Sequence, residues 1–238
     1  MLPLQLDCIF FDLDNTLLDH DTAEHLGFND TLIAHSLCTP NQLPELFSEY
    51  KVINDTLWQQ LREGKTTAQQ IRTERFYQLL LQCFDFGKAY STQLAEDLGE
   101  YYLESYERHW QLFPYATEVL QHAKQTVGKV GIITNGFTQQ AKRKFRRFNF
   151  SGLVDSMIVS SEVGIAKPDK QIFDIALESV SVPNSKNALF VGDHYDVDIL
   201  GAKNAGWQTV WFSPTHQHQT TLEADYTINS LHQLIELL

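Results

Sequence analysis

The chain has 238 residues, 43% hydrophobic and 20% charged, a composition typical of a soluble globular protein with one large domain or one domain carrying an insertion. No apolar run approaches the roughly 18 residues that a membrane-spanning helix needs. The formal net charge of −12 argues against duplex nucleic acid and anionic membranes as partners. It still allows an anionic small substrate, because a bound divalent cation dominates the field around it.

The cysteines and the first residues of the chain indicate the cellular compartment. Cys8, Cys38 and Cys83 are odd in number and widely spaced, which suits a reducing compartment and indicates neither a disulfide framework nor a cysteine-type zinc site. No basic segment precedes the first apolar run, and Asp7 interrupts it, so we expect no signal peptide. These features predict a cytoplasmic location.

The first predicted element is a short buried strand, Cys8–Phe11, which ends abruptly in the sequence DLDNT. In open α/β sheets ligands bind just beyond the carboxyl ends of the strands, where Asp12 and Asp14 stand. An extended backbone would direct these two carboxylates to the same side, and neighbouring anions repel unless a cation or a shared proton separates them. The stretch therefore predicts half of a metal site.

From Thr16 to about Arg108, apolar residues recur three and four positions apart without a strong strand signal. The spacing predicts four or five helices, with breaks near Gly64 and Gly87. Because no strand alternates with these helices, we expect residues 17–108 to form a helical subdomain inserted into a core domain of residues 1–16 and 109–238.

From about Phe113, helices and strands alternate, which predicts a parallel, doubly wound sheet of the α/β class. Strands are expected at 130–133, 153–159, 188–191, 209–212 and 226–228. Helices are expected over 114–127, up to about 148, over 168–180, up to about 205, and at the C-terminus. The polar segment 215–221, which contains two histidines, is typical of a solvated loop.

One basic stretch of the chain precedes the 153–159 strand. Its apolar residues, Phe145 and Phe148, interleave with the basic ones at helical spacing. This pattern favours a solvated helix face with an inward apolar stripe over a phosphate-binding patch. The basic residues are Lys142, Arg143, Lys144, Arg146 and Arg147.

Polar groups stand at or near the ends of several predicted strands, and in a parallel sheet those ends share one edge. Thr134 and Asn135 follow one strand, Lys167 precedes Pro168, and Asp193 follows Gly192. Asp193 would add a third carboxylate to Asp12 and Asp14, giving an oxygen-ligand set that suits Mg²⁺. Asp198 is placed to support the site from the next helix.

The remaining groups suit phosphate. Gly136, after Thr134 and Asn135, lets backbone N–H groups approach an anion closely. The ammonium of Lys167 would neutralise a carboxylate and contact a phosphate oxygen. Together these residues would support phosphoryl transfer through an aspartyl-phosphate, with a second carboxylate moving the proton. The chain contains neither a GxxxxGK[ST] loop nor a GxSxG elbow, which argues against a Walker-type NTPase and an α/β-hydrolase.

The segments FDLDNTLL, IITNG, AKPD and VGDHYDVDILGAKNAG closely resemble, in this order, the four motifs of the haloacid dehalogenase-like (HAD) superfamily. The match covers the core domain. The resemblance implies that Asp12 is the nucleophile and Asp14 the acid/base. It further implies that Thr134 and Lys167 orient phosphate, and that Asp193 binds Mg²⁺ beside Asp12 and the backbone carbonyl of Asp14.

The resemblance also implies a function. The inserted helices look like the family's C1-type cap, which closes over the substrate. The family's dehalogenases lack the second aspartate, because a halide leaving group needs no proton, so Asp14 favours a phosphatase. The run GIITNGFTQQAKRKF is most similar to the bacterial pyrimidine 5′-nucleotidase branch.

We therefore expect a Mg²⁺-dependent phosphatase for a small phosphorylated metabolite, first of all a nucleoside 5′-monophosphate. Phosphoglycolate, FMN and sugar phosphates are alternative substrates, and a non-catalytic HAD-like protein for binding or regulation is the alternative of another class. Neither a nucleic-acid polymer nor a membrane is expected as a partner, and both a monomer and a dimer remain open. Substrate choice is expected to lie in the insertion, and packing or solvation is favoured over substrate contact for each of its polar or aromatic candidates, which are Asp19, His20, His25, Trp58 and Arg62.

Overall fold

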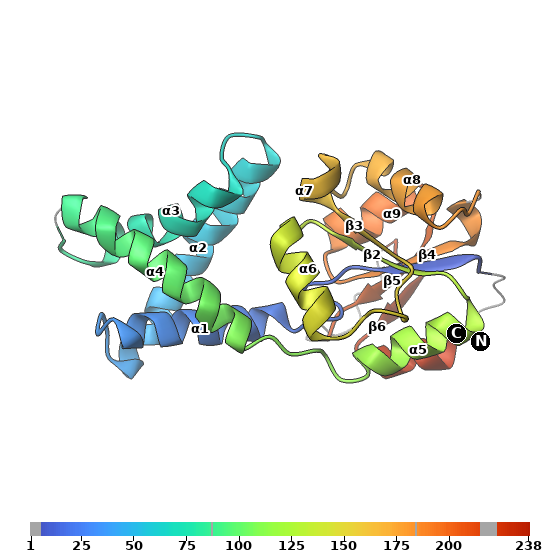
Figure 1. Ribbon diagram of the computed structural model, residues 1–238, viewed down its shortest axis with the longest axis horizontal. Coiled ribbons are helices and arrows are strands. Elements are labelled where there is room, and N and C mark those ends of the chain that lie inside the picture. Colours follow the sequence, from blue (N-terminus) through green and yellow to red (C-terminus); the bar gives the residue numbers. More distant parts are fainter. Residues whose placement is uncertain (1–5, 87, 184, 215–222) are drawn as a thin grey trace. The chain divides into compact units, whose positions relative to one another are not determined.

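The computed structural model describes residues 6–86, 88–183, 185–214 and 223–238 (Figure 1). The chain divides into two compact units, one of Met1–Asp19 with Leu112–Leu238 and one of His20–Gln111. The loop predicted at 215–221 and the break predicted at Gly87 lie outside the described residues. None of the described helices is both long and apolar enough to cross a bilayer.

A parallel six-stranded sheet forms the centre of the first unit and confirms the predicted doubly wound fold. The strand order is β3-β2-β1-β4-β5-β6, so the direction of chain progress reverses between β1 and β4. Ligands of such sheets bind at this switch point. The strands are β1 (Cys8–Phe11), β2 (Val130–Thr134), β3 (Ser156–Val159), β4 (Ala188–Gly192), β5 (Gln208–Phe212) and β6 (Tyr226–Ile228).

Helices cover both faces of this sheet (Figure 1). Successive residues of a strand point to opposite faces, so Ile9 and Phe11 pack toward α5 and α10, while Cys8 and Phe10 pack toward α8 and α9. The helical elements of the unit are α5 (Ala116–Thr126), α6 (Thr138–Arg147), α7 (Ser160–Val163), α8 (Lys170–Ser179), η2 (Ser185–Asn187), η3 (Tyr195–Ile199), α9 (Leu200–Asn204) and α10 (Leu231–Leu237).

One strand is shorter than predicted: β3 begins at Ser156 instead of Leu153. The amides of Leu153 and Val154 both donate to the carbonyl of Phe150, at 3.0 and 3.1 Å, and this closes a turn where the apolar sequence suggested a strand. Periodicity alone does not distinguish a buried turn from a strand end, because both bury apolar side chains.

The second unit is helical, as predicted, and its described residues contain no strand. Aromatic residues dominate its core, in which the Arg75 guanidinium lies 4.5 Å from the centre of the Tyr102 ring and donates to the Tyr50 hydroxyl at 3.1 Å. This unit therefore has its own packed interior. Its elements are α1 (His20–Ala34), η1 (Pro40–Gln42), α2 (Leu43–Arg62), α3 (Ala68–Cys83) and α4 (Lys88–Arg108).

Candidate active site

Strand β1 delivers Asp12 to the carboxyl edge of the sheet. The Asp12 amide donates to the carbonyl of Val191 at 2.8 Å, so the pairing of β1 with β4 continues through it. The buried Asp12 Oδ1 accepts a hydrogen bond from Lys167 Nζ at 2.6 Å. Burial raises the pKa of Asp12 to about 7, although Lys167 acts in the opposite direction. Asp12 is thus a buried carboxylate whose partner is an ammonium group.

Asp14 has a different lysine as its partner. Its Oδ1 lies 2.5 Å from Lys144 Nζ, which comes from helix α6. The prediction that the basic residues of 142–147 form a solvated face holds for four of them but is wrong for Lys144, which is 2% exposed. The sequence contains a signal for this, since Lys144 lies three residues after the buried Ala141 and at the border of the apolar stripe of α6. Sequence reasoning missed a functional candidate here.

Lys167 lies between two carboxylates. Its Nζ is 2.6 Å from Asp12 Oδ1 and 2.7 Å from Asp198 Oδ1, and the side chain is buried. Burial acts to lower the pKa of Lys167, but the two carboxylates outweigh burial and hold that pKa above its usual range. The two carboxylates therefore favour the charged ammonium form of Lys167.

The side chain of Asn135 holds the main chain of Lys167. Asn135 Nδ2 donates to the Lys167 carbonyl at 2.8 Å, and the Lys167 amide donates to Asn135 Oδ1 at 2.9 Å. The sequence suggested a phosphate-binding role for Asn135. Both polar atoms of its side chain are used in the contact with Lys167, and a role in phosphate binding stays a prediction for Asn135.

The loop after β2 meets the loop after β1. Thr134 is buried at the end of β2, and its Oγ1 accepts a hydrogen bond from the Gly136 amide at 3.1 Å. A Cβ atom added to Gly136 would lie 3.2 Å from Thr134 Oγ1 and 3.7 Å from Asp14 Oδ2. The absence of a side chain at Gly136 thus leaves space beside both groups.

Strand β4 contributes the remaining carboxylates. Asp193 Oδ1 accepts a hydrogen bond from Thr16 Oγ1 at 3.3 Å, and burial, with the charges of Asp12 and Asp198, raises the pKa of Asp193 to about 9. Asp198, in η3, is buried, and its Oδ2 accepts a hydrogen bond from the His194 amide at 3.0 Å. It packs so closely on Gly192 that a Cβ there would lie 2.5 Å from Asp198 Cβ.

Asp12, Asp193 and Asp198 form a group that suits a divalent cation. Each offers an oxygen atom, and these oxygens lie within 4.8 Å of one another. Opposite ligands of an octahedral Mg²⁺ are about 4.2 Å apart, so the three fit around one ion with small shifts. Burial, and after it the charges of neighbouring carboxylates, raise the pKa values of Asp12 and Asp193, and a bound cation would favour their ionised forms. The Asp14 carboxylate is not in this group.

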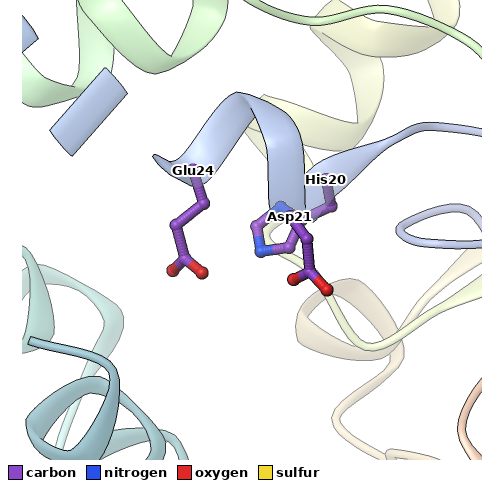
Figure 2. Close-up of side chains that lie close together, drawn as sticks. All are labelled: His20, Asp21 and Glu24. Carbon is purple, nitrogen blue, oxygen red and sulfur yellow. The ribbon is translucent and has the colours of Figure 1, made fainter. Parts of the chain in front are cut away.

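A second group of possible ligands, His20, Asp21 and Glu24, projects from the start of α1 in the helical unit (Figure 2). The carboxylate of Glu24 is already paired, with Lys51 Nζ at 2.7 Å and Asn54 Nδ2 at 3.0 Å. We therefore assign no metal to this group, which is satisfied by the side chains around it.

Comparison with known proteins identifies the family of the chain. A family model for haloacid dehalogenase-like hydrolases matches residues 6–206. Pyrimidine 5′-nucleotidase YjjG of Escherichia coli is 32% identical over 239 residues, covering 99% of both chains. Glyceraldehyde 3-phosphate phosphatase of Pyrococcus furiosus is 28% identical, covering 98% of this chain and 93% of the relative. The structure of YfnB from Bacillus subtilis bound to magnesium matches with a TM-score of 0.79 and 26% identity over 98% of both chains.

Proposed function

Because the chain belongs to the haloacid dehalogenase-like hydrolase family and is a phosphoric monoester hydrolase, we propose that it is a Mg²⁺-dependent nucleoside 5′-monophosphatase. The observation that carries the choice of substrate is the 32% identity to a pyrimidine 5′-nucleotidase over 99% of both chains. The second candidate is a sugar-phosphate phosphatase, which the 28% identity to a glyceraldehyde 3-phosphate phosphatase favours.

In the proposed reaction Asp12 attacks phosphorus. With Oδ1 held by Lys167, we assign the attack to Oδ2. A bond forms between this oxygen and phosphorus, the bond from phosphorus to the ester oxygen breaks, and Asp14 gives its proton to the departing alkoxide. Asp14 then takes a proton from water, whose oxygen attacks phosphorus and releases Asp12 and inorganic phosphate.

The residues around Asp12 would bind the phosphoryl group. Lys167 and the hydroxyl of Thr134 would donate to its oxygens, together with main-chain amides near Gly136. Asn135 would keep Lys167 in place through the two hydrogen bonds to its main chain. Asp198, which contacts Lys167 at 2.7 Å, would hold the ammonium from the other side.

Asp12, Asp193 and the main-chain carbonyl of Asp14 would hold Mg²⁺, with Asp198 in support. A bound Mg²⁺ supplies a Lewis acid that offsets charge on the transferring phosphoryl group. The crowded carboxylate oxygens and the magnesium named for the Bacillus subtilis structure support this proposal. The proposed substrate is a small metabolite, without a nucleic-acid polymer or membrane as partner, and the proposed location is the cytoplasm, where the free cysteines stay reduced.

A panel of phosphate monoesters tests the proposal. It would contain pyrimidine and purine nucleoside 5′-monophosphates, glyceraldehyde 3-phosphate, phosphoglycolate and FMN, each assayed with Mg²⁺ and after chelation by EDTA. We expect the highest kcat/KM for a nucleoside monophosphate, with no turnover in EDTA or by Asp12→Asn. A sugar phosphate preferred by tenfold or more would replace the nucleotide assignment, and full activity of Asp12→Asn would contradict the mechanism.

A further inference from the structure

Lys144 is a buried cation in a helix whose other basic residues are exposed. Removing an ammonium group from water is costly unless a counter-charge lies close by. Asp14 is that counter-charge, 130 positions away in the chain, with its Oδ1 at 2.5 Å from Lys144 Nζ. Ordinary surface pairing is found on the same helix, where Lys142 contacts Glu162 at 3.0 Å with both side chains half exposed. The contact of Lys144 with Asp14 differs from this surface pair because the lysine is buried.

The two oxygens of Asp14 have different surroundings. Oδ1 accepts a charge-assisted hydrogen bond from Lys144. Oδ2 lies 3.7 Å from the position that a Cβ of Gly136 would occupy, and so faces the loop that carries Thr134. Lys144 thus restricts rotation of the Asp14 carboxyl group. The other carboxylate oxygen, Oδ2, lies on the side of the proposed phosphate-binding loop.

We propose that Lys144 is a positioning residue for Asp14, directing Oδ2 toward the ester oxygen that leaves during phosphoryl transfer. The proposal rests on the proposed function, in which Asp14 protonates that oxygen. A general acid must lie within hydrogen-bond reach of its acceptor, so a freely rotating carboxyl group would protonate the alkoxide less often. Helix α6 begins four residues after Thr134, and Lys144 therefore also links the loop after β2 to the loop after β1.

Phosphate esters with different leaving groups distinguish a positioning role of Lys144 from a purely structural role. An alkyl phosphate such as a nucleotide needs a proton on its departing oxygen, whereas 4-nitrophenyl phosphate releases a stable phenolate without one. Because Asp14 also serves as the base when the aspartyl-phosphate is hydrolysed, a step that both esters share, the comparison uses kcat/KM, which reports the steps up to release of the alcohol or phenol. We expect Lys144→Met to lower kcat/KM for the best alkyl ester of the panel by about 10- to 100-fold, at or below the roughly 10²- to 10⁴-fold contribution of a general acid. We expect kcat/KM for 4-nitrophenyl phosphate to fall less than about threefold. The exposed control, Lys142→Met, should change neither rate.

A second variant and a second background complete the test. Lys144→Arg keeps the charge but is longer, and we expect it to show the same selective loss to a smaller degree. In the Asp14→Asn background, Lys144→Met should add no further loss on the alkyl ester, because the residue it positions has been disabled. An equal loss on both esters, in Lys144→Met and Lys144→Arg alike, would overturn the proposal. If wild type turns over neither ester, or Asp12→Asn matches wild type, the proposed function fails instead.

Discussion

At the scale of single residues, the site is defined by two lysine–carboxylate pairs. Lys167 lies between Asp12 and Asp198, and Lys144 lies against Asp14. Among the residues that the structure describes, the three clustered carboxylates have one ammonium group, that of Lys167, in contact with them; the carboxylates are those of Asp12, Asp193 and Asp198. This imbalance is the physical reason to expect a cation there, and it separates the proposed nucleophile, Asp12, from Asp14, which lies outside the cluster and has its own lysine.

Asn135 provides a test of how Lys167 is held. Asn135→Ala would leave the amide and carbonyl of Lys167 without their partners, and an unsatisfied buried backbone group costs about 1–3 kcal/mol. We expect a lower free energy of unfolding and a kcat reduced about tenfold, because Lys167 Nζ would no longer be fixed beside Asp12. Urea unfolding and steady-state kinetics measure the two effects. Asn204→Ala, on the exposed end of α9, is the matched control. An unchanged kcat for Asn135→Ala would show that Lys167 needs no such support.

At the scale of elements, the two edge strands begin in the same way. Asp155 precedes β3, and its Oδ2 accepts from the Val130 amide at the start of β2, at 2.9 Å. Asp225 precedes β6, and its Oδ2 accepts from the Thr209 amide of β5, also at 2.9 Å. Each aspartate also contacts a lysine, Lys124 or Lys203. A carboxylate thus joins the beginning of each edge strand to its inner neighbour.

These two aspartates predict an acid-sensitive sheet. Burial acts to raise their pKa values, but the lysine and amide contacts outweigh burial and lower both. A lowered native pKa gives a stabilisation that is complete above the unfolded-state pKa of about 4 and is lost as pH falls through the native value. The double variant Asp155→Ala, Asp225→Ala should therefore have a lower free energy of unfolding than wild type at pH 7. The difference in free energy of unfolding between the two proteins should be smaller at pH 3. Urea unfolding at both pH values measures it, and a gap that is constant with pH would contradict the assignment.

At the scale of the whole molecule, the residues proposed for catalysis and the helical insertion belong to different units. The residues proposed for catalysis all lie in the unit with the sheet, while the helical unit has its own core around Arg75, Tyr50 and Tyr102. The resemblance to C1-type caps therefore leads us to propose that the helical unit selects the substrate. The net charge of −12 makes the molecule as a whole favourable to cations.

Binding of Mg²⁺ should stabilise the folded protein. A ligand at 100 times its Kd adds about 2.7 kcal/mol, which raises Tm by roughly 5–10 °C for a protein of this size. We expect such a shift on adding Mg²⁺ at constant ionic strength, and we expect Asp193→Asn to abolish it. Asp196→Asn, an exposed neighbour in η3, should keep it. Thermal unfolding followed by circular dichroism measures the shift, and an equal shift in the Asp193→Asn variant would place the ion elsewhere.

The sequence by itself determined the fold class and the edge of the sheet where the polar groups gather. Local hydrophobic periodicity predicts the alternation of strands and helices. The short apolar strand before Asp12 can be recognised without knowledge of its distant partners. The four motifs were sufficient to identify the family, which the family model confirms over residues 6–206. These are properties of contiguous residues, which a single sequence contains in full.

Only the tertiary structure decided which charges meet. Lys144 and Asp14 are 130 positions apart, and Asn135 and Lys167 are 32 apart. Whether a lysine on an amphipathic helix faces water or a carboxylate depends on how that helix is rotated against the sheet, which helical spacing alone leaves open for a residue at the border of the apolar stripe. The extent of β3 was likewise decided by the turn at Phe150. The sequence around the first strand thus predicted where the site lies. Tertiary packing determined that Asp12 and Asp14 contact different lysines.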